Sequence, residues 1–81
     1  DFLRLKKIID NSNFNYDNIK NLYYFKSRRW DIETKDDLII KLPSKELNVS
    51  FDILSKIYKN QKFKDIKVID LRKENLVTLD G

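Results

Sequence analysis

The chain has no cysteine and no histidine, and it contains only one glycine and one proline among its 81 residues. Without cysteine there is no disulfide, thiolate nucleophile or cysteine zinc site, and either redox compartment is possible. Without histidine the chain lacks the commonest general base and metal ligand, and its serines have no partner for a catalytic triad. The single glycine, Gly81, excludes a glycine-rich phosphate loop. We therefore expect no catalytic residues, no cofactor and no bound metal.

Long hydrophobic runs are missing as well. No segment approaches the ~18 apolar residues of a membrane span, and the start of the chain has neither a methionine nor a signal-peptide pattern. We therefore expect a piece of a longer protein whose anchor or targeting segment lies elsewhere. The 17 Lys and Arg outnumber the 13 Asp and Glu only slightly, which gives a net charge of +4. This mild basicity, spread along the chain, favours solubility more than a nucleic-acid-binding stripe.

The remaining composition, 41% hydrophobic and 12% aromatic, is typical of one globular domain spanning residues 1–81. Apolar residues at helical spacing predict an amphipathic helix over residues 2–9 and a second from Leu47 to Tyr58, with Ser44 or Asn48 as its N-cap. Strand patterns cover the other hydrophobic segments. The predicted fold class is α+β, an antiparallel β-sheet with two amphipathic helices packed on it in the order α-β-β-β-α-β-β. The predicted strands are residues 19–25, 30–34, 38–42, 66–72 and 76–79.

Alternation along the strands predicts where the sheet turns. Apolar residues occupy odd positions in 19–25 (Ile19, Tyr23 and Phe25) but even positions in 30–34, so a bulge or a break is expected near Ser27–Arg29. A three-residue loop over 35–37 then pairs Trp30 with Leu42, Ile32 with Ile40 and Thr34 with Leu38, which buries one consistent face. This register sets Asp31 opposite Lys41 and requires a left-handed backbone at Asp37.

Three segments in this order carry a resemblance to a known family. They are Arg28-Arg29-Trp30-Asp31-Ile32, then Leu38-Ile39-Ile40-Lys41-Leu42-Pro43, then Ile69-Asp70-Leu71-Arg72. Together they resemble the C-terminal (β) part of the extracytoplasmic region of the FtsQ/DivIB cell-division family, over residues 19–80 and loosely over the first helix. Two departures are the Asp36-Asp37 turn, where the family usually has glycine, and Lys73, where an aromatic residue can occur.

The resemblance implies a non-catalytic division scaffold of the cell inner membrane, with this domain in the periplasm. A cytoplasmic tail, a membrane helix and a POTRA domain precede the region in the family. The implied partner is the small bitopic protein FtsB (DivIC in its relatives), in a complex that also holds FtsL. Binding is by addition of a partner strand to the edge of the last strand. The expected partner-binding residues are Arg28, Arg29, Arg72, Lys73, Asn75, Val77 and Leu79.

Each expected role has an ordinary structural alternative. Arg28 and Arg29 could be solvated charges at a strand end, and Val77 and Leu79 could be core residues, because alternation permits either face. Trp30 is interpreted as a core residue, since it shares a face with Ile32. The competing function is a small basic module for single-stranded nucleic acid, which would use Arg28, Arg29 and Trp30. A POTRA-like piece with another client fits the order of elements poorly.

Overall fold

The computed structural model describes residues 2–60, 65–73 and 76–81. Two α-helices and five strands lie in these residues, in the predicted α-β-β-β-α-β-β order, so the α+β fold class is confirmed. A short 3₁₀ helix that the sequence did not predict precedes the first strand. The elements are α1 (Phe2–Asp10), η1 (Tyr16–Asn18), β1 (Ile19–Tyr24), β2 (Trp30–Thr34), β3 (Ile39–Lys41), α2 (Leu47–Lys59), β4 (Val68–Asp70) and β5 (Thr78–Asp80).

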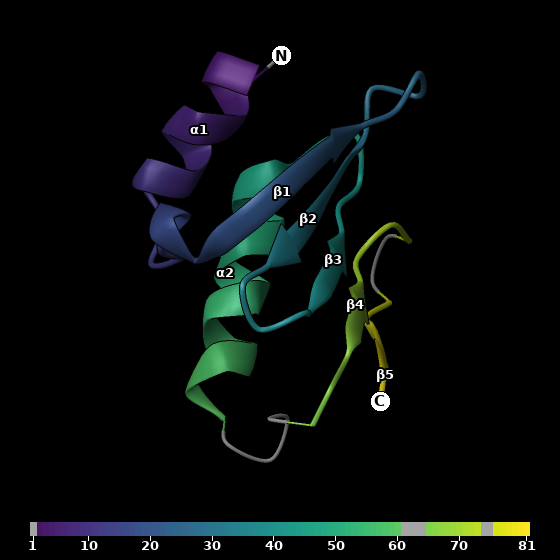
Figure 1. Cartoon of the computed structure of the whole chain (residues 1–81). Helices are drawn as coiled ribbons and strands as arrows, with labels where there is room; N and C mark the ends of the chain where they lie inside the picture. Colours follow the sequence, from purple (N-terminus) through teal and green to yellow (C-terminus); the bar gives the residue numbers. More distant parts are fainter. Residues whose placement is uncertain (1, 61–64, 74–75) are drawn as a thin grey trace.

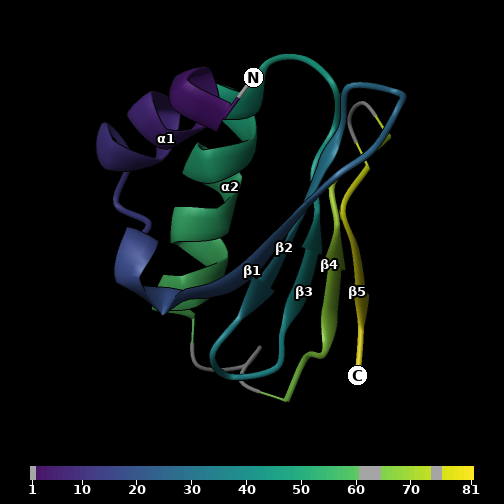
Figure 2. The same ribbon diagram turned by 45° about the horizontal axis from the view of Figure 1, so that its top comes forward.

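The molecule has two layers. The strands form one sheet in the order β1-β2-β3-β4-β5, and α1 and α2 lie on the same face of it (Figure 1). A view turned by 45° separates the helical layer from the sheet and places β5 at the sheet edge (Figure 2). We call the helix-covered side the inner face and the opposite side the outer face.

The sheet is mixed, so the expectation of an antiparallel sheet is wrong at one pair of strands. β3 and β4 are parallel, with Ile40 opposite Ile69, whereas the other neighbouring strands are antiparallel. The cause is α2, which connects β3 to β4 as a crossover and returns the chain to the end where β3 began. After the crossover, β4 adds to the sheet beside β3, and β5 then pairs with β4 as the last strand.

The expected break between the first two strands is a hairpin turn. Phe25 N–H donates to the Arg29 carbonyl at 2.9 Å, and Arg28 has a left-handed backbone with φ 63°. This turn pairs Tyr24 with Trp30 and Leu22 with Ile32. Leu22 and Tyr24 therefore lie on the inner face.

Alternation assigns the odd residues Tyr23 and Phe25 to the buried, apolar face of the first strand. In the structure they do not lie on the inner face. Tyr23 donates through its hydroxyl to Glu33 at 3.0 Å and stays 46% exposed. A register shift between Ile19 and Asn21 lets Ile19 still pack against the core. The predicted break near Ser27–Arg29 is thus the hairpin turn, and the register shift at the start of β1 is a second irregularity that the parity argument did not predict.

The second hairpin has the predicted register. Ile32 lies opposite Ile40 and Asp31 opposite Lys41, while Thr34 N–H donates to the Leu38 carbonyl at 2.9 Å. Leu42 N–H donates to the Trp30 carbonyl at 3.0 Å, and the backbone of Asp37 is left-handed with φ 65°. Alternation and turn length together were sufficient to fix this register.

Helix α2 begins differently from the prediction. Its N-cap is Glu46, which has a left-handed backbone (φ 57°) and makes no side-chain capping bond, so neither Ser44 nor Asn48 is the cap. Phe51 and Leu54 are buried as the helical spacing predicted, and the Phe51 ring packs on Phe14 with centroids 5.7 Å apart. The amphipathic pattern therefore gave the buried side of the helix but not its start.

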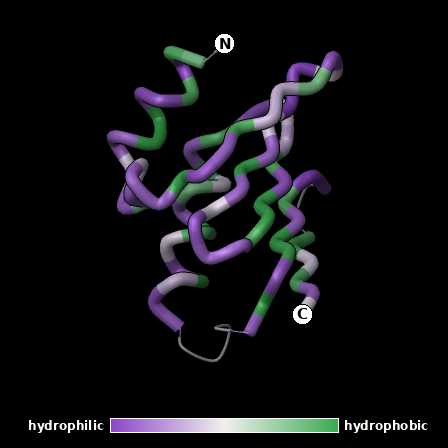
Figure 3. Tube along the Cα trace, viewed as in Figure 1, coloured by the Kyte–Doolittle hydropathy of each residue, from purple (hydrophilic) through white to green (hydrophobic). Residues whose placement is uncertain are grey.

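One row of apolar residues crosses the whole inner face. The register of each strand pair aligns Leu22, Ile32, Ile40, Ile69 and Leu79. Ile32 and Ile40 are completely buried, and residues of both helices, including Leu5 and Leu54, complete the core. Apolar residues recur along the central strands when the trace is coloured by hydropathy (Figure 3).

The two C-terminal strands are shorter than the patterns predicted. β4 spans Val68–Asp70 within the predicted 66–72, and β5 spans Thr78–Asp80, two residues later than the predicted start at 76. Pairing with β3 continues one residue past β4, because Leu71 N–H donates to the Lys41 carbonyl at 2.8 Å. Within the described ranges, no helix is both long and apolar enough to cross a bilayer.

Candidate functional site

The edge formed by β5 is the main candidate for a partner-binding site. β5 is the last strand of the sheet, and no described strand pairs with its other side. Figure 2 shows both helices on the inner face, away from this edge. An unpaired edge carries main-chain N–H and C=O groups that a second polypeptide can pair with.

The hydrogen bonds of β4 identify which groups of β5 point outward. Ile39 N–H donates to the Lys67 carbonyl, and Leu71 N–H donates to the Lys41 carbonyl, so the main chain of Ile69, which lies between them in β4, faces β3. Because main-chain groups alternate sides, Val68 and Asp70 face β5, where they lie opposite Asp80 and Thr78.

Leu79, between those two positions, consequently turns its own N–H and C=O away from β4. The 2.7 Å bond from Lys67 N–H to the Asp80 carbonyl agrees with this assignment, because it shows Asp80 facing inward to β4. The open edge is therefore centred on the main chain of Leu79.

The side chain of Leu79 has a different role from its main chain. It lies in the apolar row of the inner face, opposite Ile69, and packs against the domain's own core. Val77, just before β5, is 37% exposed, and Leu76 is 51% exposed. Of the two apolar contacts that the sequence predicts on this strand, Val77 thus presents its side chain to solvent. Asn75 lies outside the described residues.

A groove of about 510 Å³ lies beside this edge, between the start of α2 and the connection from β4 to β5. Val49 and Ile53 of α2 line it together with Leu76 and Val77. Cationic side chains outnumber acidic ones at its rim. The charged lining residues are Lys45, Arg72, Lys73 and Glu46.

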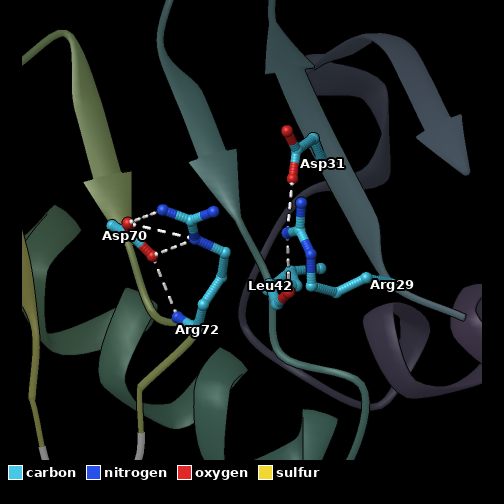
Figure 4. Close-up of polar contacts among 5 residues, drawn as sticks. All are labelled: Arg29, Asp31, Leu42, Asp70 and Arg72. Carbon is cyan, nitrogen blue, oxygen red and sulfur yellow. Dashed lines mark hydrogen bonds and ion pairs between the residues drawn. The ribbon is translucent and has the colours of Figure 1, made fainter. Parts of the chain in front are cut away.

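Arg72, two residues past the end of β4, is held by Asp70, the last residue of that strand. Its Nε lies 2.9 Å from Asp70 Oδ1 and its Nη2 lies 2.7 Å from Asp70 Oδ2, and its main-chain N–H donates to Oδ1 at 3.0 Å (Figure 4). Residues two apart on a strand share a face, so both side chains lie on the outer face. The hydrogen bonds from the Arg72 guanidinium hold the pKa of the Asp70 carboxyl at about 2, below its ordinary 3.8.

The two adjacent arginines have separate environments. The Arg29 Nη1 donates to Asp31 Oδ1 at 2.8 Å and to the Leu42 carbonyl at 3.0 Å, and the guanidinium lies over the Phe25 ring. Only 18% of this side chain is exposed. Arg28, in contrast, is an exposed residue of the hairpin turn. Arg29 is therefore engaged by its own domain, and Arg28 extends from the turn.

The structure brings some of the predicted residues together and leaves others apart. Arg72, Lys73 and Val77 all line the groove beside β5. Arg29 shares the outer face with Arg72, with β3 between them in Figure 4. Nothing in the described contacts joins Arg28 to this group. The predicted partner-binding residues thus include a group of neighbours beside β5 and one residue, Arg28, in the hairpin turn away from them.

Sequence reasoning missed Asp70 as a member of this site. The available signal was the Asp-x-Arg spacing within a strand, because alternation puts such a pair on one face at ion-pair distance. The groove residues Val49 and Ile53 were also missed. Their contribution depends on how α2 packs beside the β4–β5 connection, which no local pattern encodes.

Trp30 is confirmed as a residue packed against the core. Its ring lies 4.6 Å from the Tyr24 ring and 6.4 Å from the Phe2 ring, measured between centroids. With Arg29 bound to Asp31, the cluster proposed for stacking nucleic-acid bases has its ring and one of its two cations engaged within the domain.

Comparison with known proteins gives one family. The family model described as "Cell division protein FtsQ/DivIB, C-terminal" matches residues 2–72. The match includes α1, which the motifs covered only loosely, and ends at Arg72, so β5 lies beyond it. No curated protein matches the chain.

Proposed function

This chain belongs to the FtsQ/DivIB C-terminal family of cell-division proteins, and we propose that its β5 edge binds an FtsB/DivIC-like partner by strand addition. The family is a non-enzymatic one. We propose further that residues 1–81 form one scaffold domain that acts in the periplasm, attached to the cell inner membrane through a segment outside this chain, within a complex that also contains an FtsL-like protein.

One observation carries this proposal: the outward-facing N–H and C=O of Leu79 on an edge strand without a described neighbour. A partner strand beside β5 would satisfy both groups, and its alternate side chains would reach the inner and outer faces of the sheet. The Leu79 side chain, held in the core, would keep this edge in place during binding.

The surroundings of the edge favour an acidic and apolar partner. Lys45, Arg72 and Lys73 line the groove with one acid, Glu46, and a second acid, Asp70, pairs with Arg72 beside it, so one positive charge remains. Val77 and Leu76 offer exposed apolar surface. Charge complementarity of this kind speeds association and excludes wrong partners. We therefore propose that Arg72 and Lys73 bind acidic side chains and that Val77 packs on an apolar one. We propose Arg28 and Arg29 as a second charged contact, in which Arg28 has the more accessible side chain.

The experiment compares Val77→Pro with Val77→Ala in binding to the soluble extracytoplasmic segment of the FtsB-like partner. Val77 directly precedes β5, and continuing the alternation of β5 by one step would turn its N–H outward like that of Leu79. Proline removes this donor without removing a bond to β4, and proline is tolerated at an open edge. Alanine keeps the donor and removes only the side chain.

We expect Val77→Pro to weaken binding at least about tenfold, because an acceptor of the partner stays unpaired, and Val77→Ala to weaken it less. Circular dichroism of both variants controls for folding. Equal binding by Val77→Pro and the unchanged chain would refute strand addition. Binding of a single-stranded oligonucleotide that falls steeply with salt would instead favour the nucleic-acid alternative.

A further inference from the structure

The ion pair between Asp70 and Arg72 leaves much of the arginine available. A guanidinium has five N–H donors, and Asp70 accepts from Nε and from one hydrogen of Nη2. Both N–H groups of Nη1 and one of Nη2 have no acceptor among the described residues. The side chain is 45% exposed, so solvent or a partner can reach these donors.

The ion pair also fixes the direction of these donors. The guanidinium lies on the β3 side of Asp70, over the outer face of the sheet (Figure 4). Its pKa is raised mainly by the hydrogen bond to Asp70 and also by the charge of Asp31 on β2. Without Asp70, the long arginine side chain would sample many rotamers, several of them directed to solvent beyond the end of β4.

We propose that Asp70 is a positioning residue, which holds the Arg72 guanidinium over the outer face so that its free donors bind an acidic side chain of the partner. This inference rests on the proposed function. It adds that the partner extends from the β5 edge onto the uncovered face of β4, because the free donors of Arg72 lie there. A bidentate carboxylate contact needs a guanidinium in a defined orientation, and Asp70 supplies that orientation before binding.

A positioning role and a simple charge effect predict opposite changes in partner affinity for Asp70→Asn. Removing an acid from the site should strengthen attraction to an acidic partner if only charge matters. If Asp70 acts by positioning, the same substitution weakens binding roughly 3- to 10-fold, as expected when one long side chain must be ordered during binding. Asp80→Asn is the matched control, because it removes the same charge from β5 and has no described contact with Arg72. We expect Asp80→Asn to leave binding unchanged or to strengthen it.

The decisive test is a double-mutant cycle with the same FtsB-like segment. Asp70→Asn should weaken binding in the unchanged chain and have no effect in the Arg72→Ala background, because Asp70 acts only through Arg72. Unchanged or tighter binding by Asp70→Asn, or an equal effect in both backgrounds, overturns the positioning role. Strand addition is judged separately by Val77→Pro, so the two proposals fail independently.

A measurement without the partner tests the same inference. The Arg72 Nε–H group should have a high NMR order parameter in the unchanged chain and a clearly lower one in Asp70→Asn, while backbone order parameters of β4 stay equal. Equal mobility of Nε–H in the two proteins would overturn the positioning role, whatever the partner does. A merely structural role of Asp70 would alter the β4 backbone instead.

Discussion

Arg29 was predicted to bind a partner, whereas in the structure it binds groups of its own domain. Replacing it therefore tests directly whether these contacts stabilise the fold. Replacing Arg29 with alanine removes two hydrogen bonds from a charged donor, one to Asp31 and one to the Leu42 carbonyl. It also removes the guanidinium from the Phe25 ring, 4.8 Å from its centroid. Asp31, whose side chain is only 14% exposed, then loses its ion-pair partner.

The size of the effect follows from these contacts. Hydrogen bonds to charged groups contribute roughly 1.5–3 kcal/mol each, and a cation–π contact contributes about 0.5–1 kcal/mol. Water reaches part of this site and the contributions overlap, so we expect a net loss near 3 kcal/mol in the free energy of unfolding. This is a large fraction of the roughly 4–12 kcal/mol expected for a domain of this size.

Urea unfolding followed by circular dichroism measures this loss. Lys26→Ala is the matched control, because it removes a cation from an exposed position of the same hairpin and should change stability by less than about 0.5 kcal/mol. Arg29→Lys should recover only part of the loss, since an ammonium group cannot reproduce the planar fork. If Arg29→Ala is as stable as Lys26→Ala, the internal contacts of Arg29 do not stabilise the fold and this reasoning is refuted.

Two further predictions concern the second hairpin and Asp70. Asp37→Gly should raise the free energy of unfolding by about 0.5–1 kcal/mol in thermal unfolding, because φ is 65° at this position and glycine adopts that backbone without strain; a lower stability would contradict it. Asp70 has a folded pKa of about 2 against an ordinary 3.8, so its stabilising contribution is complete above pH 3.8 and disappears as pH falls through about 2. The stability difference between the unchanged chain and Asp70→Asn should shrink over that window, and a carboxyl NMR titration of Asp70 with a midpoint at 3.8 or above would show that Arg72 does not hold it.

The features predicted correctly depend on short-range rules. The register of the second hairpin follows from the alternation of Ile32 with Ile40 and from one turn length, both of which act within a dozen residues. The left-handed backbone at Asp37 follows from the same turn. The family motifs lie on these strands and on β4, which explains why sequence alone identified both the fold class and the family.

The wrong predictions concern positions where two local rules competed or where contacts between segments distant in sequence determined the structure. Tyr23 and Phe25 are apolar enough for a core yet lie on the outer face, because the turn at Arg28 sets the register. There the Tyr23 hydroxyl binds Glu33 and the Arg29 guanidinium covers the Phe25 ring. The parallel pairing of β3 with β4 had a signal in the strand-helix-strand order, which is the pattern of a crossover connection. Glu46 is the N-cap of α2 because the chain enters the helix through a left-handed turn, and no side-chain preference predicts that.

The length of β5 constrains how the proposed interface obtains its affinity. A strand of three residues presents few outward main-chain groups, and the N–H and C=O of Leu79 would contribute about 1–3 kcal/mol together at ordinary hydrogen-bond values. Association costs more than this in lost freedom, so main-chain pairing alone cannot hold a partner. The remaining free energy must come from side chains beside the edge, and those available are the apolar groove surface around Val77 and the Arg72 donors held by Asp70. A short edge also resists unspecific pairing with other strands, so specificity and affinity both depend on these flanking side chains.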